Sequence, residues 1–201
     1  MAYDAARERV VLHGGSVVIG MRSSAGEDKP GSEIWYEETW EYDGASWTPR
    51  PSAGPGTRAH HCLAYDPVRK VTMLYGGISQ DRKERTETWG WDGTRWKTLA
   101  DSGPGPRSRC RMAFHEPTGE MVLYGGNVPH SGNGFKLIGD TWVWNGKEWI
   151  ERTPKDTPGP RFMHAMAYLA DSKRVVLYGG VRNAQERDDA WGWDGQNWSP
   201  F

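Results

Sequence analysis

The feature that most restricts the fold of this chain is one sequence pattern that occurs four times. Each copy has a short apolar run that ends in a double glycine. After an interval of variable length come two tryptophans seven residues apart, with Asp-Gly or Asn-Gly between them. The double glycines are Gly14-Gly15, Gly76-Gly77, Gly125-Gly126 and Gly179-Gly180, and the first tryptophans are Trp40, Trp89, Trp142 and Trp191. A period of about 50 residues is typical of repeat architectures, so the repeat constrains the fold more than any single element does.

Each copy is predicted to form a four-stranded antiparallel sheet. The second strand runs into the double glycine, which permits a bulge or the close approach of a neighbouring backbone. Asp-Gly and Asn-Gly are strong signals for a hairpin between the third and fourth strands. If the hairpin loop has two residues, Trp91 pairs with Thr94. Trp89 then lies opposite Trp96, which gives every copy a cross-strand aromatic pair.

A single sheet of this size cannot bury its faces, so the copies must pack on one another. The predicted fold class is therefore all-β: a β-propeller built of four four-stranded antiparallel blades. We expect one domain over residues 1–201, with blades at about 1–50, 51–100, 101–153 and 154–201.

The joint recurrence of the double glycine, the spaced tryptophans and the strand pattern resembles the kelch repeat, and the resemblance covers nearly the whole chain. It implies a kelch-type propeller, a class that usually has more than four blades. Three arrangements follow as alternatives. The chain is a piece of a longer propeller, its four blades close into a ring, or a partner chain completes a larger ring as a homodimer.

Charge and composition narrow the partners that we expect. The chain has 25 basic and 26 acidic residues, so no overall field attracts nucleic acid or an anionic membrane. No apolar run approaches the roughly 18 residues that cross a bilayer, and the first residues lack the apolar region of a secretory signal. We expect a soluble chain without a nucleic-acid or membrane partner, in a compartment that the sequence leaves open. Cys62 and Cys110 suit buried thiols better than a disulfide framework or a zinc site.

The connections between second and third strands differ most among the copies, and they are predicted to emerge on one side together with the linkers between blades. Variable loops on one face of a rigid scaffold are typical of binding proteins. Aromatic side chains beside polar groups suit a protein or a carbohydrate ligand. The candidate ligand-binding residues are Trp35, Tyr36, Arg82, Arg85, His130, Phe135, Lys136, Arg182 and Arg187. The alternative is that these are solvated loops.

The linkers before copies two, three and four place Arg58, Arg107 and Arg161 at one repeated position. One hypothesis is a ring of guanidinium groups at the channel mouth that holds a carboxylate. The other is a structural clamp between blades that pairs with the acidic residue before each third-strand tryptophan. Those acidic residues are Glu38, Glu87, Asp140 and Asp189. Because both columns recur in step with the repeat, we favour the structural interpretation.

His61, Cys110 and His164 share one position on the predicted innermost strands, and His60 precedes the first of them. Two histidines and a cysteine are potential ligands of a soft metal. Residues of one column lie on separate blades, however. We therefore expect histidines bonded to backbone carbonyls, and we predict neither a metal site nor a cofactor.

The sequence contains no nucleophile elbow, phosphate loop or zinc-binding helix motif, and we assign no catalytic residue. The first hypothesis is a non-catalytic module that binds a protein or a carbohydrate on the face with the variable loops. Because some kelch-like propellers are oxidases or sugar isomerases, the resemblance also implies an alternative, a fragment or relative of such an enzyme. A further alternative is a structural assembly element, since a shared fold does not by itself confer chemistry.

Overall fold

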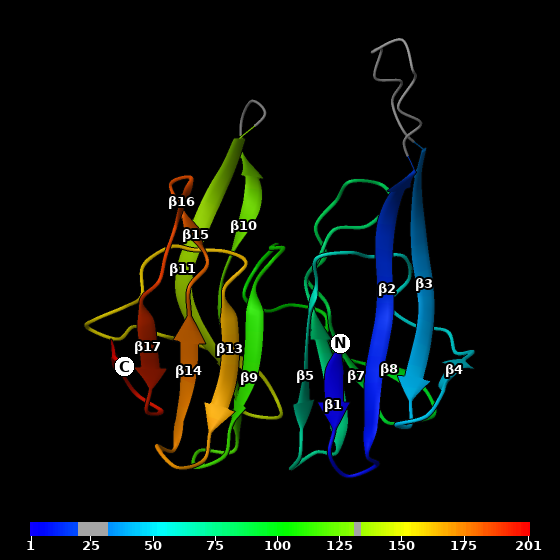
Figure 1. The fold of residues 1–201 in the computed structure, drawn as a ribbon, viewed down its shortest axis with the longest axis horizontal. Helices are drawn as coiled ribbons and strands as arrows, with labels where there is room; N and C mark the ends of the chain where they lie inside the picture. The colour runs from blue at the N-terminus through cyan, green and yellow to red at the C-terminus, as the bar shows by residue number, and fades with distance from the viewer. Residues whose placement is uncertain (20–31, 131–133) are drawn as a thin grey trace.

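The computed structural model describes residues 1–19, 32–130 and 134–201, and within these ranges every regular element is a β-strand. The strands form four four-stranded antiparallel sheets and one additional two-stranded hairpin. The predicted all-β architecture of four antiparallel blades is thus confirmed (Figure 1). No helix of the described residues is long and apolar enough to cross a membrane.

The four blades follow one another along the chain. Blade 1 consists of β1 (Ala2–Asp4), β2 (Arg9–Ile19), β3 (Ser32–Tyr42) and β4 (Trp47–Arg50). Blade 2 consists of β5 (Cys62–Asp66), β6 (Val71–Tyr75), β7 (Thr88–Trp91) and β8 (Trp96–Ala100). Blade 3 consists of β9 (Arg111–His115), β10 (Glu120–His130), β11 (Gly134–Trp144) and β12 (Trp149–Arg152). Blade 4 consists of β13 (Ala165–Leu169), β14 (Arg174–Tyr178), β17 (Ala190–Trp193) and β18 (Trp198–Pro200). The short hairpin of β15 (Val181–Arg182) and β16 (Gln185–Glu186) connects β14 to β17.

The first strand of each blade is the innermost one. Inner strands of successive blades contact each other in the order β1, β5, β9 and β13, and Figure 1 shows them next to one another in the middle of the molecule. The second strands end and the third strands begin toward the upper end in this view, as β2 and β3, β10 and β11, and the β15–β16 hairpin between β14 and β17 show. We call this end the loop face.

The hairpin between third and fourth strands has a different register from the predicted one. Trp91 pairs with Trp96 rather than with Thr94, and Trp89 pairs with Thr98, so the prediction was wrong. The loop has four residues because Asp92 Oδ1 accepts hydrogen bonds from the amides of residues 94 and 95, as an Asx turn does. The cross-strand aromatic pairs therefore use the residue two places after the first tryptophan. They are Tyr42–Trp47, Trp91–Trp96, Trp144–Trp149 and Trp193–Trp198, with ring centroids 5.3 to 5.6 Å apart.

Neighbouring blades share apolar clusters that we call seams. In each seam the tryptophan that begins the fourth strand donates its indole N–H to a threonine of the preceding blade. Trp96 donates to Thr39 at 2.8 Å, Trp149 to Thr88 at 2.7 Å and Trp198 to Thr141 at 2.9 Å. Because these groups are buried, the hydrogen bond removes the cost of burying both of them unpaired.

The second strand also contributes one aromatic residue to each seam, directly before the double glycine. Tyr75 packs on Trp149 with ring centroids 5.5 Å apart, and its hydroxyl donates to the Gly105 carbonyl of the next linker at 2.9 Å. Tyr124 repeats both contacts in the next seam, and His13 occupies the position in the first one.

The double glycines bring the chain close to the following linker, as predicted. A Cβ atom on Gly76 would lie 2.6 Å from the carbonyl oxygen of Arg107, and the Gly77 amide donates to that same oxygen at 2.9 Å. Both glycines also have positive φ. Glycine is required here because a side chain would displace the linker.

The two end blades expose side chains that the described residues do not cover. In blade 4, Tyr178 is 55% exposed, whereas the equivalent Tyr75 and Tyr124 are fully buried. In blade 1, Tyr3 is 57% and Trp47 43% exposed. The end blades thus retain side chains that the inner blades bury against a neighbour.

Candidate functional site

A pocket on the loop face lies where blades 1, 2 and 3 meet, and it has a volume of about 250 Å³. Strands β3, β10 and β11 and the β6–β7 connection form its walls together with two linkers. The lining residues are Glu33, Trp35, His60, Ile78, Arg82, Glu84, Ser108, Arg109, Asn127, Pro129 and Phe135. Side chains far apart in sequence are thus gathered around one hollow.

Two arginines of the pocket lie over aromatic rings. The guanidinium carbon of Arg82 is 5.5 Å from the ring centroid of Trp35, and that of Arg109 is 5.8 Å from the ring centroid of Phe135. Both distances fall within the range of cation–π attraction. The first pair joins blades 1 and 2, and the second joins the linker before blade 3 to β11 of that blade.

The two arginines differ in their acidic partners. Arg82 forms an ion pair with Glu33, whereas no carboxylate of the described residues lies within 4 Å of the Arg109 guanidinium group. The Nε atom of Arg109 is buried without a hydrogen-bond partner among the described atoms. Its Nη2 atom lies 3.4 Å from Nε2 of His60. The pocket therefore contains one cation that the described residues do not neutralise.

Burial alters the protonation of this pair. Desolvation lowers the pKa of Arg109, and desolvation together with the Arg109 charge lowers the pKa of His60. His60 is accordingly neutral at neutral pH, and its Nε2 atom can accept the hydrogen bond from Arg109. An added carboxylate would offset the cost of desolvating the Arg109 charge and would favour the charged form of His60.

Backbone strain places His60 and Arg109 side by side. His60, Arg109 and Met163 have φ values of 59°, 56° and 58°, in the left-handed region that residues other than glycine rarely adopt. The Arg109 amide donates to the His60 carbonyl at 2.7 Å, and the Met163 amide donates to the Arg109 carbonyl at 3.2 Å. Each residue stands two places after a linker arginine, so they form a column around the inner strands.

The sequence prediction missed Arg109 as a site residue and considered His60 only beside the metal column. The signal was available, because both residues follow a linker arginine by the same two places. The two residues share one backbone conformation but have different side chains. The variable loops likewise differ in sequence at equivalent places of the repeat.

Three of the nine predicted loop residues line the pocket: Trp35, Arg82 and Phe135. The structure places the other six elsewhere on the loop face. Tyr36 is 42% exposed on β3, and Arg85 pairs with Asp81 at 2.9 Å. His130 and Lys136 are exposed on β10 and β11.

Arg182 and Arg187 belong to the β15–β16 region of blade 4 and do not line the pocket. The guanidinium group of Arg182 lies next to Gly159, and Arg187 lies 3.9 Å from Asp189. The pocket between blades 1, 2 and 3 thus excludes the fourth variable loop.

The linker arginines Arg58, Arg107 and Arg161 are only 1 to 2% exposed, and each is held within its own blade. Arg107 Nη1 lies 2.6 Å from Asp140, and Arg161 Nη1 lies 2.8 Å from Asp189. Arg58 Nη2 lies 3.6 Å from Glu87 Oε2.

Each linker arginine also donates to the carbonyl of the first glycine of its blade, at 3.0 to 3.2 Å. Three of the four acidic residues of the structural clamp hypothesis, Glu87, Asp140 and Asp189, are therefore paired with these arginines, within a blade rather than between blades. Glu38 pairs with no arginine of the described residues. Because the three guanidinium groups are buried and bonded within the protein, they do not form the open channel-mouth site of the other hypothesis.

Each of the three residues His61, Cys110 and His164 contacts a different neighbour. His61 lies 5.9 Å from the His13 ring, and His164 lies 5.8 Å from the Tyr124 ring. Cys110 Sγ lies 3.0 Å from Cys62 Sγ, and both are buried free thiols. In the described part of the chain no three His, Cys, Asp or Glu side chains are grouped as metal ligands would be.

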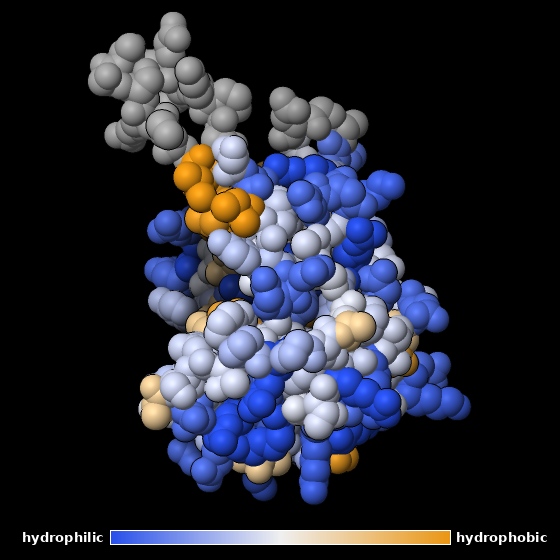
Figure 2. All heavy atoms as spheres, turned by 90° about the vertical axis from the view of Figure 1, so that its right-hand side faces the viewer, coloured by the Kyte–Doolittle hydropathy of each residue, from blue (hydrophilic) through white to orange (hydrophobic). Residues whose placement is uncertain are grey.

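A hydrophobic patch adjoins the loop-face pocket on the extended β2–β3 ribbon. Figure 2 shows these apolar side chains gathered toward one end of the molecule. They are Val17, Val18, Ile19 and Ile34, and each is 41 to 66% exposed. Exposed apolar patches of this kind mark interaction surfaces in many proteins.

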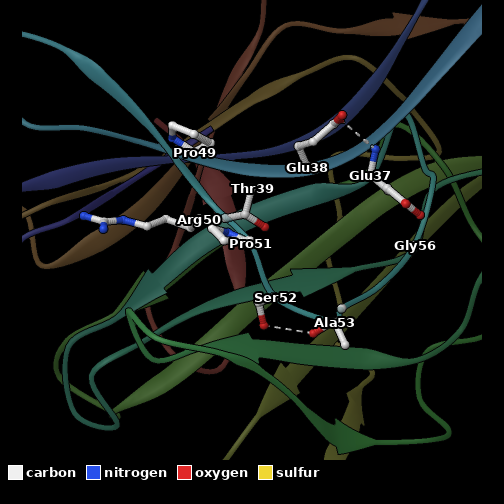
Figure 3. Close-up of a pocket in the computed structure, with 10 residues that line it drawn as sticks. Glu37, Glu38, Thr39, Pro49, Arg50, Pro51, Ser52, Ala53 and Gly56 are labelled. Carbon is white, nitrogen blue, oxygen red and sulfur yellow. Dashed lines mark hydrogen bonds between the residues drawn. The ribbon is translucent and has the colours of Figure 1, made fainter.

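A second pocket, of about 420 Å³, lies at the edge of blade 1 (Figure 3). The third and fourth strands of blade 1 and the following linker form its walls, which carry prolines and two acidic residues. The lining residues are Glu37, Glu38, Thr39, Pro49, Arg50, Pro51, Ser52, Ala53, Gly54 and Gly56. None of the residues predicted from the loops is among them.

Scanned against models of known protein families, the chain matches none, and a search of the curated proteins finds no match.

Proposed function

We propose that this chain is a kelch-type, non-catalytic binding module that holds an acidic segment of a protein partner in the loop-face pocket. The single observation that supports this most is Arg109, a partly buried guanidinium group over Phe135 without a carboxylate partner among the described residues. A carboxylate of the partner would pair with Arg109 and reach His60, in the forked geometry that arginine favours.

The surroundings of the pocket support a protein partner more than a carbohydrate. Arginine, tryptophan and phenylalanine are enriched at protein interfaces, and this pocket combines all three. The neighbouring apolar patch on β2 and β3 extends the surface in a way that suits apolar side chains of a partner. Arg82 and Arg109 already cover one face of each aromatic ring, which leaves less ring surface for a stacked sugar.

The test is selection from a displayed library of random peptides, with a glycan array as the parallel arm. We expect the selected peptides to be enriched in Asp and Glu, because the unpaired charge in the pocket is positive. Arg109→Met should weaken the binding of a selected acidic peptide about ten-fold, as the loss of a charge-assisted hydrogen bond does.

Arg182→Met is the matched control, since it removes an arginine from the same face outside the pocket. Unfolding midpoints of both variants should stay near that of the unmodified chain. Selected peptides without acidic residues, or equal binding by the Arg109→Met variant, would contradict the proposal. Glycan binding that depends on Trp35 and Phe135, without peptide binding, would favour the carbohydrate alternative instead.

A further inference from the structure

The linkers before blades 2, 3 and 4 share the sequence Pro-Gly-x-Arg, at residues 55–58, 104–107 and 158–161. All three are seated in the same way, and each arginine side chain turns back to its own proline. Arg58 Nη2 donates to the Pro55 carbonyl at 2.7 Å, and Arg107 and Arg161 donate to the carbonyls of Pro104 and Pro158.

The blade that follows supplies three partners for this segment. Its acidic residue before the third-strand tryptophan pairs with the arginine, and its first double-glycine carbonyl accepts a hydrogen bond from the same guanidinium group. The third partner is the tryptophan of the fourth strand, which lies against the backbone just before the proline. A Cβ atom on Gly54 would lie 2.6 Å from the Trp96 ring, and one on Gly103 would lie 2.8 Å from the Trp149 ring.

Blade 1 has the same three partners, but no described segment covers them. Glu38 stands at the acidic position, Gly14 at the first glycine and Trp47 at the fourth-strand tryptophan. Trp47 is 43% exposed, whereas Trp96 and Trp149 are 5% and 9% exposed.

The Glu38 carboxylate is exposed at the rim of the second pocket, where it accepts a hydrogen bond from the Glu37 amide at 3.2 Å (Figure 3). No lysine or arginine of the described residues pairs with it. The Trp47 ring is already held in place by Tyr42, with centroids 5.3 Å apart. The site is therefore largely formed before any segment binds.

We infer that blade 1 is a docking site for a Pro-Gly-x-Arg segment from outside residues 1–201. The arginine pairs with Glu38 and donates to the Gly14 carbonyl, and the backbone before the proline lies on Trp47. The three internal segments define this chemistry, because they occupy the equivalent groups of blades 2, 3 and 4.

A second copy of this chain does not supply the segment in its folded form. All three of its Pro-Gly-x-Arg arginines are buried in their own blades. The only other Pro-Gly pair, Pro30-Gly31, is followed by Ser32 and Glu33 and so lacks the arginine. The occupant is therefore a segment that lies outside the folded residues 1–201.

The test uses a synthetic peptide with the sequence SAGPGTRAH, which is that of residues 52–60. Fluorescence anisotropy of the labelled peptide measures its binding to the whole chain. We expect saturable binding that falls about ten-fold for Glu38→Gln, because the charged partner of the arginine is lost. Trp47→Ala should cause a similar loss. A peptide with citrulline in place of arginine should not bind, since citrulline keeps the shape without the charge.

Glu37→Gln is the matched control, because the adjacent residue lies in the same pocket but outside the acidic column. Its binding should equal that of the unmodified chain, and the unfolding midpoints of all variants should agree. Absence of saturable binding at millimolar peptide, or equal binding by Glu38→Gln, would overturn the inference. Binding lost in Tyr178→Ala but kept in Glu38→Gln would place the peptide on blade 4 and would also overturn it. A doubled mass in sedimentation that Trp47→Ala abolishes would assign the face to a second copy.

Discussion

The seams between blades and the loop face use the same repeated backbone in opposite ways. In the seams the same side chains recur at the same positions, and their polar groups bond to one another, as the three Trp–Thr hydrogen bonds show. On the loop face the backbone column of His60, Arg109 and Met163 also recurs, but its side chains differ from blade to blade. Repetition thus marks the parts that hold the blades together, and variation within a repeated frame marks the candidate site.

Arg107 and Arg109 show this contrast between structural and candidate binding residues, although they are only two positions apart in the sequence. Arg107 is 1% exposed and forms two hydrogen bonds to the Asp140 carboxylate. Arg109, two residues later, contacts an aromatic ring and a histidine, with no carboxylate of the described residues beside it. An arginine in a linker is therefore assigned to structure or to binding by its partners and not by its position in the sequence.

The largest effect is expected when this contrast is tested by matched substitutions. Arg107→Met leaves the Asp140 carboxylate and the Gly125 carbonyl without their buried partner, which should lower the free energy of unfolding by about 3–5 kcal/mol. Arg109→Met should change it by less than about 0.5 kcal/mol, because its guanidinium group has no such network. Urea denaturation followed by tryptophan fluorescence measures both. Equal losses in the two variants would remove the distinction between seam and site.

The seam of blades 1 and 2 should respond to acid, because it has His13 where the other two seams have tyrosine. Burial lowers the pKa of His13 to about 4, so between pH 6.5 and pH 4 the unfolded chain binds a proton that the folded chain does not. Stability from this group is therefore complete above pH 6.5 and decreases as the pH falls toward 4, by about 3 kcal/mol in total.

His13→Tyr should make the decrease in stability shallower, since a tyrosine hydroxyl can donate to the Gly56 carbonyl as Tyr75 does to Gly105. Unfolding midpoints at pH 7.5 and pH 5 compare the variant with the unmodified chain. Some pH dependence should persist, because burial also lowers the pKa of His164, to about 3. An identical dependence in both proteins would show that His13 is not buried in its neutral form.

The smallest effect concerns the threonine that accepts the indole N–H in each seam. Thr141→Ala should lower the free energy of unfolding by about 1–2 kcal/mol, because the buried Trp198 N–H loses its acceptor. Blade 4 has Ala190 at the equivalent position. Ala190→Thr should leave the stability within about 0.5 kcal/mol, since no described tryptophan lies beyond it to donate. A clearly higher thermal unfolding midpoint for Ala190→Thr would show that another blade packs against the outer face of blade 4.

Much of the fold could be predicted because its signals are local. The apolar runs, the double glycines and the Asp-Gly or Asn-Gly turns act over a few residues, and each occurs four times. The predicted hairpin register was wrong because it rested on the Asp-Gly signal alone. The side chain of Asp92 caps two amides and widens the loop to four residues, which the strong Asp-Gly signal for a two-residue turn obscured.

The sequence by itself determined the all-β architecture, the four blades and the column of linker arginines with its acidic partners. The tertiary structure alone decided which loop residues meet, that Trp35, Arg82 and Phe135 share a pocket, and that Arg109 lies beside His60, a residue 49 positions away. It also showed that Trp47 and Tyr178 are exposed while their equivalents are buried. The physical reason is range: turns and strand patterns depend on neighbours in sequence, whereas partners across a seam or a pocket depend on how whole blades pack.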